Sequence, residues 1–101
     1  MNIQKLMKQA QQAQMQMAAV QEELANEVIE ASAGGGMVKV SMSCDRNLKA
    51  VRIDPAAVDP EEVELLEDMI LAAISEASRT AEAIAAAKME EVTGGMNIPG
   101  L

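Results

Sequence analysis

Residues Asp59–Gly95 read DPEEVELLEDMILAAISEASRTAEAIAAAKMEEVTGG, the longest uninterrupted helical pattern in the chain. Asp59 is a favourable N-cap residue, Pro60 suits the first helical position, and the acidic residues that follow lie against the positive end of the helix dipole. No glycine or proline then occurs before Gly94. At about 1.5 Å per residue, a helix from Pro60 to about Val92 reaches roughly 50 Å, which is long for a small domain.

Apolar side chains recur along this stretch at three- and four-residue steps, and charged residues occupy most of the positions between them. A chain of 101 residues can hardly cover so long an apolar row by itself. We therefore expect a homodimer in which a second copy covers the remainder. The expected dimer interface comprises Leu66, Ile70, Ala73, Ala77, Ala81 and Ile84.

A second helix is predicted from Asn2 to about Ala25. Its apolar positions alternate steps of three and four residues, as in a heptad seam. The seam comprises Ile3, Leu6, Ala10, Ala13, Met17, Val20 and Leu24. Two interpretations stay open, namely an amphipathic helix packed on its own domain, or a coiled-coil contact with the long helix or with a partner chain.

Between the two helices, alternating residues predict three strands at 26–33, 37–43 and 48–53. Gly34–Gly36 favours a tight turn over a phosphate-binding loop, because the lysine and hydroxyl of a P-loop do not follow. Short connections make an antiparallel meander the simplest pairing. The chain is thus predicted to be a single α+β domain over 1–101, with the order αβββα. Gly94 is expected to lie past the helix end, and 93–101 to form a flexible tail.

The composition excludes several classes of function. The chain has no Phe, Tyr, Trp or His, so Met and Ala must fill a thin core. Without His, and with Cys44 as the single thiol, the usual zinc ligands, a Ser-His-Asp triad and a Cys-His pair are excluded. The acidic residues at the helix start are explained by capping. We expect no enzyme activity, metal, cofactor or small-molecule substrate.

The lone cysteine and the hydropathy pattern indicate where the protein works. Cys44 has no partner for a disulfide within its own chain, which is typical of a reducing cytoplasm. The N-terminus contains too many glutamines for a signal peptide, and no apolar run approaches membrane-spanning length. We therefore expect a cytoplasmic protein without a membrane partner.

Charge is distributed unevenly along the chain. Residues 1–52 carry six basic and five acidic residues, whereas residues 53–101 carry two basic and eleven acidic residues. The net charge of −8 therefore comes from the second half, and a cationic surface in the first half can attract a polyanion. The candidate nucleic-acid contacts are Lys5, Lys8, Lys39, Arg46, Lys49 and Arg52. For each of them, the alternative is a solvated surface charge or a partner for the acidic helix.

The mode of any DNA binding can also be predicted. The chain has no aromatic residue to stack on a base and no recognition-helix motif. Contacts to phosphates alone give weak binding that falls steeply with salt and tolerates different sequences. If the dimer binds DNA, we therefore expect binding of this kind.

The order and spacing of several short motifs resemble the YbaB/EbfC family of small bacterial nucleoid-associated proteins. The matching segments are residues 33–40 (AGGGMVKV), 51–55 (VRIDP), 58–64 (VDPEEVE), 66–70 (LEDMI) and 93–95 (TGG). The resemblance implies an αβββα protomer that forms a homodimer with projecting helices. It also implies sequence-tolerant binding of double-stranded DNA in the nucleoid, with effects on nucleoid organisation and transcription, and no catalysis.

A rival interpretation is a protein-interaction scaffold or adaptor that reaches DNA only through a partner. Its acidic long helix and its methionines would dock a basic or apolar protein. The discriminating observation is whether the purified protein, free of other proteins, binds DNA.

Overall fold

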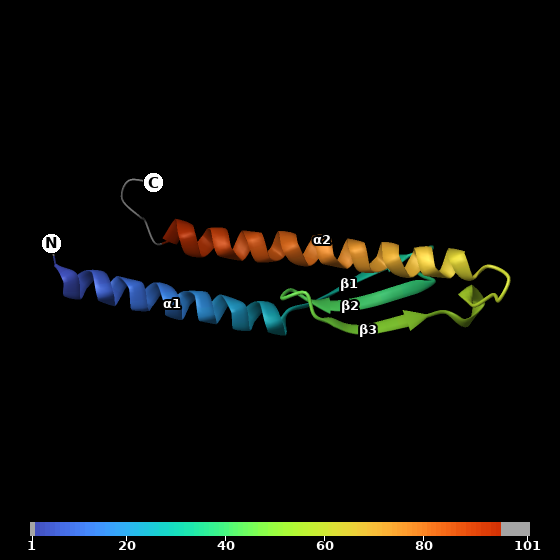
Figure 1. Ribbon diagram of the computed structural model, residues 1–101, viewed down its shortest axis with the longest axis horizontal. Helices are drawn as coiled ribbons and strands as arrows, with labels where there is room; N and C mark the ends of the chain where they lie inside the picture. Colours follow the sequence, from blue (N-terminus) through green and yellow to red (C-terminus); the bar gives the residue numbers. More distant parts are fainter. Residues whose placement is uncertain (1, 96–101) are drawn as a thin grey trace.

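The computed structural model describes residues 2–95. Its elements follow the predicted order, so the α+β class and the αβββα arrangement are confirmed (Figure 1). They are α1 (Ile3–Asn26), β1 (Val28–Ala33), β2 (Val38–Ser43), β3 (Leu48–Ile53), the short 3-10 helix η1 (Pro55–Ala57) and α2 (Val63–Gly95). The strands form one antiparallel sheet in the order β1-β2-β3, as the short connections predict.

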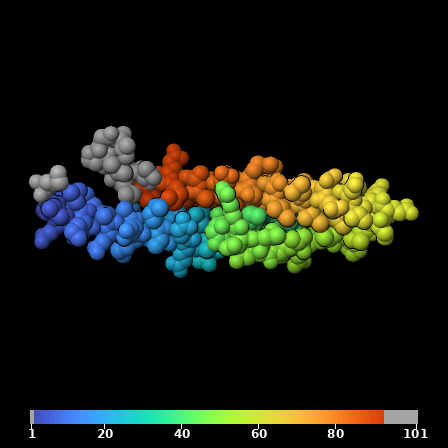
Figure 2. All heavy atoms as spheres, in the orientation of Figure 1, coloured from blue at the N-terminus to red at the C-terminus, as the bar shows by residue number. Residues whose placement is uncertain are grey.

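The molecule is a rod whose Cα atoms span 70 × 22 × 16 Å. Helix α2 runs along most of this length, with one half over the sheet and the other half beside α1 (Figure 1). The space-filling view shows a thin rod, in which α2 lies directly on the layer formed by α1 and the sheet (Figure 2). Such a shape leaves a large share of each element on the surface.

The main core lies between β2 and the first half of α2. Alternate residues of β2, Val38 and Val40, are fully buried, and Met42 is nearly so. They pack against a row of small residues on α2, which lets the helix lie close to the sheet. The buried row comprises Ala73, Ala77 and Ala81.

This placement removes three alanines from the expected dimer interface. Ala73, Ala77 and Ala81 have no exposed surface, so they offer nothing to a second copy. Leu66, Ile70 and Ile84 are half-buried, the first two against the main core and the third against a second cluster, so they remain candidates for the interface. The apolar face of the protomer's own sheet covers the three alanines, and the length of the helix alone gives no sign of that cover.

A smaller cluster joins the end of α1 to the second half of α2. Val20 and Leu24 are buried there together with Cys44, and Ile84 and Met89 of α2 pack against them. The other predicted seam residues are exposed or half-buried, because the first part of α1 extends beyond this contact. The seam therefore divides between a packed end and a projecting end.

Helix α2 begins later and ends later than predicted. Its first residue is Val63, because Asp59 forms a turn before the helix instead of capping it. The Oδ1 atom of Asp59 accepts a hydrogen bond from Glu61 N at 2.9 Å. This bond to the backbone two residues later is the Asx-turn pattern that makes Asp common in turns. At the other end the helix continues through Gly94 to Gly95, and the rest of the predicted tail, 96–101, lies outside the described residues.

Candidate nucleic-acid interface

The sheet has one face that α2 does not cover, and two cations lie opposite each other on it. Lys39 lies between Val38 and Val40, whose side chains face α2, so its own side chain points away from the helix. Arg52 is the cross-strand partner of Lys39 and shares that face. Like charges at opposed positions repel each other. We call Lys39 and Arg52 the sheet patch.

No ion pair among the described residues neutralises the sheet patch, although the acidic residue Glu30 lies on the same face. None of the ion pairs among residues 2–95 involves Lys39 or Arg52, and both residues are exposed. The surrounding face is open and mostly polar or small, and a shallow hollow beside Lys39 is lined by Glu30, Ala31 and Ser32. A flat cationic face without aromatic residues suits phosphate groups better than it suits bases.

Lys49 lies at an irregularity of the sheet. Ser41 pairs with Ala50 but Met42 pairs with Leu48, so Lys49 is an extra residue in β3. The simple alternation of a regular strand, which would place Lys49 and Arg52 on opposite faces, therefore does not apply at this point. Lys49 is exposed and has no ion pair among the described residues.

The β2–β3 turn next to this irregularity is held by its own side chains. Ser43 Oγ donates a hydrogen bond to Asp45 Oδ1, and Asn47 N donates one to Ser43 Oγ at 3.3 Å. The hydrogen bond from Ser43 holds the pKa of the Asp45 carboxyl below its usual value, and the nearby charge of Lys49 lowers that pKa further. The negative charge of Asp45 therefore partly offsets the positive charge of Lys49.

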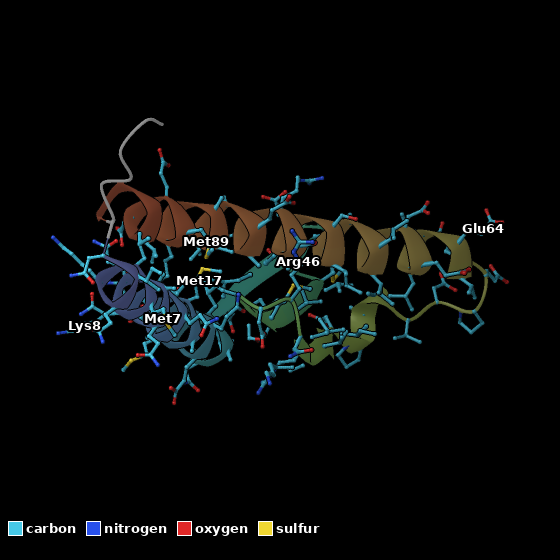
Figure 3. All side chains as sticks on the ribbon, turned by 60° about the vertical axis from the view of Figure 1, so that its left-hand side comes forward. Met7, Lys8, Met17, Arg46, Glu64 and Met89 are labelled. Atoms are coloured by element: carbon cyan, nitrogen blue, oxygen red, sulfur yellow. The ribbon has the colours of Figure 1, made fainter. Side chains whose placement is uncertain are left out.

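Arg46 is directed away from the sheet patch. It occupies the same turn with a φ of 69°, and its Nη2 atom lies 3.3 Å from Glu82 Oε1 of α2. Figure 3 shows Arg46 beside α2 rather than on the open face of the sheet. The structure therefore separates Arg46 from Lys39 and Arg52, with which it was grouped from the sequence.

Lys5 and Lys8 form a second cationic location. Both are exposed on the projecting part of α1, and Lys8 extends into solvent at the end of the rod far from the sheet (Figure 3). No ion pair among residues 2–95 involves either of them. We call them the arm pair, and the structure keeps this pair apart from the sheet patch within one protomer.

The outer face of α2 has the opposite charge. Its acidic residues are all exposed, and its single exposed arginine, Arg79, is paired with Glu76 at 2.7 Å. The exposed acids are Glu64, Glu67, Asp68, Glu76, Glu82, Glu90 and Glu91. This face repels a polyanion, whereas the exposed bases without an ion pair among the described residues lie on the opposite face of the sheet, in the β2–β3 region, and on the projecting part of α1.

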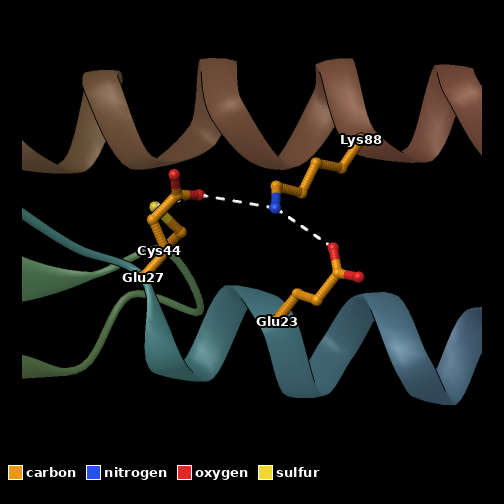
Figure 4. Close-up of polar contacts among 4 residues, drawn as sticks. All are labelled: Glu23, Glu27, Cys44 and Lys88. Carbon is orange, nitrogen blue, oxygen red and sulfur yellow. Dashed lines mark hydrogen bonds and ion pairs between the residues drawn. The ribbon is translucent and has the colours of Figure 1, made fainter.

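A polar cluster that the sequence did not reveal joins the two helices (Figure 4). Lys88 Nζ lies 3.1 Å from Glu23 Oε2 and 3.7 Å from Glu27 Oε2, and its pKa is raised mainly by the hydrogen bond to Glu23. Lys88 and its two acids come from distant parts of the chain, so no local pattern could have paired them. We call Lys88, Glu23 and Glu27 the clasp.

Cys44 lies next to the clasp but has no reactive character. Its Sγ atom donates a hydrogen bond to Glu27 Oε2 at 3.7 Å. Burial raises the pKa of the Cys44 thiol, and the neighbouring charge of Glu27 raises it further. The thiol is therefore protonated at neutral pH, so Cys44 acts as a small packing residue in the cluster that joins α1 to α2.

Two further features of the described residues bear on the class of site. Within residues 2–95, no three His, Cys, Asp or Glu side chains are arranged to hold a metal ion. In the same part of the chain, no helix has the length and apolar character needed to cross a membrane.

Comparison with known proteins gives a consistent result. The model of the YbaB/EbfC DNA-binding family matches residues 1–96. A nucleoid-associated protein of Thermoanaerobacter sp. (strain X514) is 48% identical over 100 residues, which cover 99% of this chain and 90% of the relative. A nucleoid-associated protein of Moorella thermoacetica is 48% identical over 99 residues, covering 98% and 95% of the two chains.

Among solved structures, the crystal structure of the uncharacterized protein HP0035 from Helicobacter pylori has the same fold. Its TM-score is 0.77 at 19% sequence identity, and the match covers 95% of this chain and 97% of that one. At this identity the likeness concerns the fold alone. The family match, in contrast, spans nearly the whole sequence and agrees with the resemblance carried by the short motifs. The chain belongs to the YbaB/EbfC DNA-binding family.

Proposed function

We propose that this protein is a nucleoid-associated protein that binds double-stranded DNA as a homodimer, with little sequence specificity, in the nucleoid of the cytoplasm. The family and the names of the relatives support the class of function. One structural observation supports a particular surface for DNA binding. Lys39 and Arg52 lie opposite each other on the open face of the sheet, where they repel each other and form no ion pair among the described residues. Through such binding the protein contributes to nucleoid organisation and gene regulation.

The sheet patch binds phosphates by charge. DNA phosphates placed between Lys39 and Arg52 replace their repulsion with two attractions, and counterions are released from the DNA. The flat face and the lack of aromatic residues provide no means of reading base edges. Binding therefore tolerates different sequences and weakens as salt is added.

A homodimer strengthens this weak interaction. Each copy contributes one sheet patch and one arm pair, so two copies hold twice as many cations on one assembly. The protomer also exposes large apolar side chains that a partner can cover, including Leu71 at 65% and Val28 at 52% exposure. The net charge of −8 per copy favours contacts confined to these basic patches.

Binding assays with purified protein and a fluorescent duplex test the proposal. We expect retention of the duplex at low salt, and a loss of affinity of at least about tenfold in the double variant Lys39→Gln/Arg52→Gln. Arg79→Gln is the matched control, because it removes the same kind of charge from the acidic face of α2 and should leave affinity nearly unchanged.

The outcomes separate the alternatives. Purified protein that fails to retain DNA at any salt concentration contradicts the proposed function and favours an adaptor that needs a partner. An unchanged double variant, together with weakened binding by Lys5→Gln/Lys8→Gln, moves the contact from the sheet patch to the arm pair.

A further inference from the structure

The open face of the sheet carries a row of polar side chains that crosses all three strands. Ser32 of β1 lies opposite Lys39 of β2, which in turn lies opposite Arg52 of β3. The neighbours of Ser32 along β1, Ala31 and Ala33, pack against the main core, so Ser32 shares the open face with the two bases. Because neighbouring strands lie about 4.8 Å apart, a hydroxyl group and two cationic groups follow one another at short intervals. We call these three residues the donor row.

Glu30 is the acid that borders the donor row on the same face. It precedes Ser32 by two residues on β1, its cross-strand partner is Ser41, and Lys39 is its diagonal neighbour. Diagonal neighbours in an antiparallel pair lie about 7–8 Å apart. Glu30 and Lys39 also line the same shallow hollow. Among the strand residues that the structure describes, Glu30 is the one acid.

Neither ion pairing nor protection of the sheet edge explains an acid at this position. None of the ion pairs among residues 2–95 involves Glu30, which is exposed. A charge on an edge strand such as β1 discourages pairing with the edge of another sheet. A lysine serves that purpose equally well and would also attract phosphates, so edge protection does not require a carboxylate beside the donor row.

The spacing between Glu30 and the donor row determines the size of its effect on DNA. A phosphate bound over Lys39 lies on the order of 7 Å from the Glu30 carboxylate. The repulsion of two unit charges about 7 Å apart in water corresponds to a factor of about three in a binding constant. If two copies of the surface contact one duplex, the two factors multiply to about ten.

We propose that Glu30 is an attenuator of DNA binding, which acts by repelling the phosphates that Lys39 and Arg52 attract. This inference rests on the proposed function and concerns the strength of binding at the same surface. Glu30 confines the DNA backbone to the donor row and keeps the interaction weak. Weak contacts to phosphates allow a protein to slide and hop along DNA, which a tightly bound protein does more slowly.

DNA titrations with Glu30→Gln in the full chain test the inference, because this substitution removes the charge with almost no change of shape. At low salt we expect the affinity for a fluorescent duplex to rise about threefold if one sheet patch contacts it and about tenfold if two do. Glu30→Lys, which keeps a charge on the edge strand, should raise the affinity further. Both gains should shrink as salt is added, because the Debye length falls to about 10 Å at 0.1 M.

The matched control is Glu64→Gln, which changes the net charge by the same amount. Glu64 is exposed in the first turn of α2, the helix that covers the opposite face of the sheet (Figure 3). This variant should leave the affinity nearly unchanged, and circular dichroism should show equal helicity in all variants. An equal gain in Glu64→Gln would assign the effect to net charge and would overturn the proposal.

The variant Lys39→Gln tests whether Glu30 acts on the DNA directly. If Glu30 repels phosphates, Glu30→Gln should give a similar relative gain in Lys39→Gln and in the wild type, because Arg52 still attracts the DNA. A gain that disappears in Lys39→Gln means that Glu30 acts by pairing with Lys39, and direct repulsion is then wrong.

The remaining outcomes distinguish this inference from the proposed function. If neither the wild type nor Glu30→Gln retains DNA at low salt, the proposed function itself is contradicted. If the wild type retains DNA but neither Glu30 variant binds it more tightly, the attenuator alone is overturned.

Discussion

Gly34 combines a backbone conformation and a location that disfavour any side chain. Its φ is 63°, in the left-handed region, and a Cβ atom built on it would overlap the sulfur of Met69. We expect Gly34→Ala to lower the free energy of unfolding by about 2–3 kcal/mol, from backbone strain and from the displacement of Met69. Chemical denaturation monitored by circular dichroism measures this change.

Gly35 provides the control for that prediction. Its φ of 68° is similar, but a Cβ atom there meets no atom within 4 Å. Gly35→Ala should therefore cost only the backbone strain, about 1–2 kcal/mol. Equal losses in the two variants would mean that Met69 moves aside without cost and that the Gly34 contact is unimportant.

The roles of individual cations were predicted from the sequence only in part. Lys39 lies on the face that alternation predicts, because β2 is regular and its buried neighbours fix its direction. Arg46 and Lys49 differ from expectation for two reasons. A residue of α2 far along the chain, Glu82, pairs with Arg46, and a bulge interrupts the alternation at Lys49. Neither cause has a local signal in the sequence.

At the scale of elements, the clasp fixes the angle at which α1 leaves the body. The ion pairs of Lys88 with Glu23 and Glu27 join α2 to the base of α1. We expect Lys88→Met to increase the rate at which a protease cleaves α1 under native conditions, because the small apolar cluster and the backbone hydrogen bond from Cys44 N to Leu24 O are then the main contacts that hold α1. Arg79→Met is the control, since its ion pair lies within α2 alone.

The clasp should also respond to pH with a defined sign. The hydrogen bond to Glu23 raises the pKa of Lys88 above its ordinary value of 10.5. A raised lysine pKa contributes stability that is present below the unfolded value and is lost as the pH rises through the folded value. Cleavage of α1 in the wild type should therefore accelerate above about pH 10.5, and in Lys88→Met this added step should be absent. Identical pH profiles would contradict a role for the clasp.

The elements themselves were largely predictable. Alternation placed all three strands, and the glycines between them form the expected turn with positive φ values. The start of α2 was the main error, because Asp59 and Pro60 favour a turn as well as a helix cap, and local preference cannot decide between the two. Helix ends depend on such competition more than helix centres do.

At the scale of the whole molecule, the number of cations in contact with DNA sets the salt dependence. If the two sheet patches of a dimer contact DNA, about four phosphates are neutralised, and the logarithm of the binding constant should fall against the logarithm of salt with a slope of about −4. Titrations of one duplex from low to physiological salt measure the slope. The double variant Lys39→Gln/Arg52→Gln should reduce it towards zero.

A steeper slope would change the picture of the complex. If the arm pairs also bind, about eight cations take part and the slope approaches about −7. A slope that the double variant does not alter would exclude the sheet patch from the interface. Arg79→Gln should leave the slope unchanged in either case, because Arg79 lies among acids.

The shape of the whole molecule was the least predictable level. The apolar row of α2 was expected to face a second copy, but the sheet of the same protomer covers its alanines. Strand β3 stays uncovered, because α2 packs mainly on β1 and β2. The alternating pattern of β3 gives no sign of this. The width of a helix relative to a three-stranded sheet determines this result, and that comparison requires the assembled fold.

The thin core, built on Ala73, Ala77 and Ala81, has a calorimetric consequence. These residues bury little nonpolar area each, and many larger ones, such as Leu71, are already hydrated in the folded protomer. Unfolding of a single protomer therefore exposes little additional nonpolar surface to water. Its heat-capacity change of unfolding should be lower than the roughly 12–15 cal/mol/K per residue of ordinary globular proteins. A small increment flattens the stability curve, so a lone protomer would gain and lose little stability between cold and warm conditions.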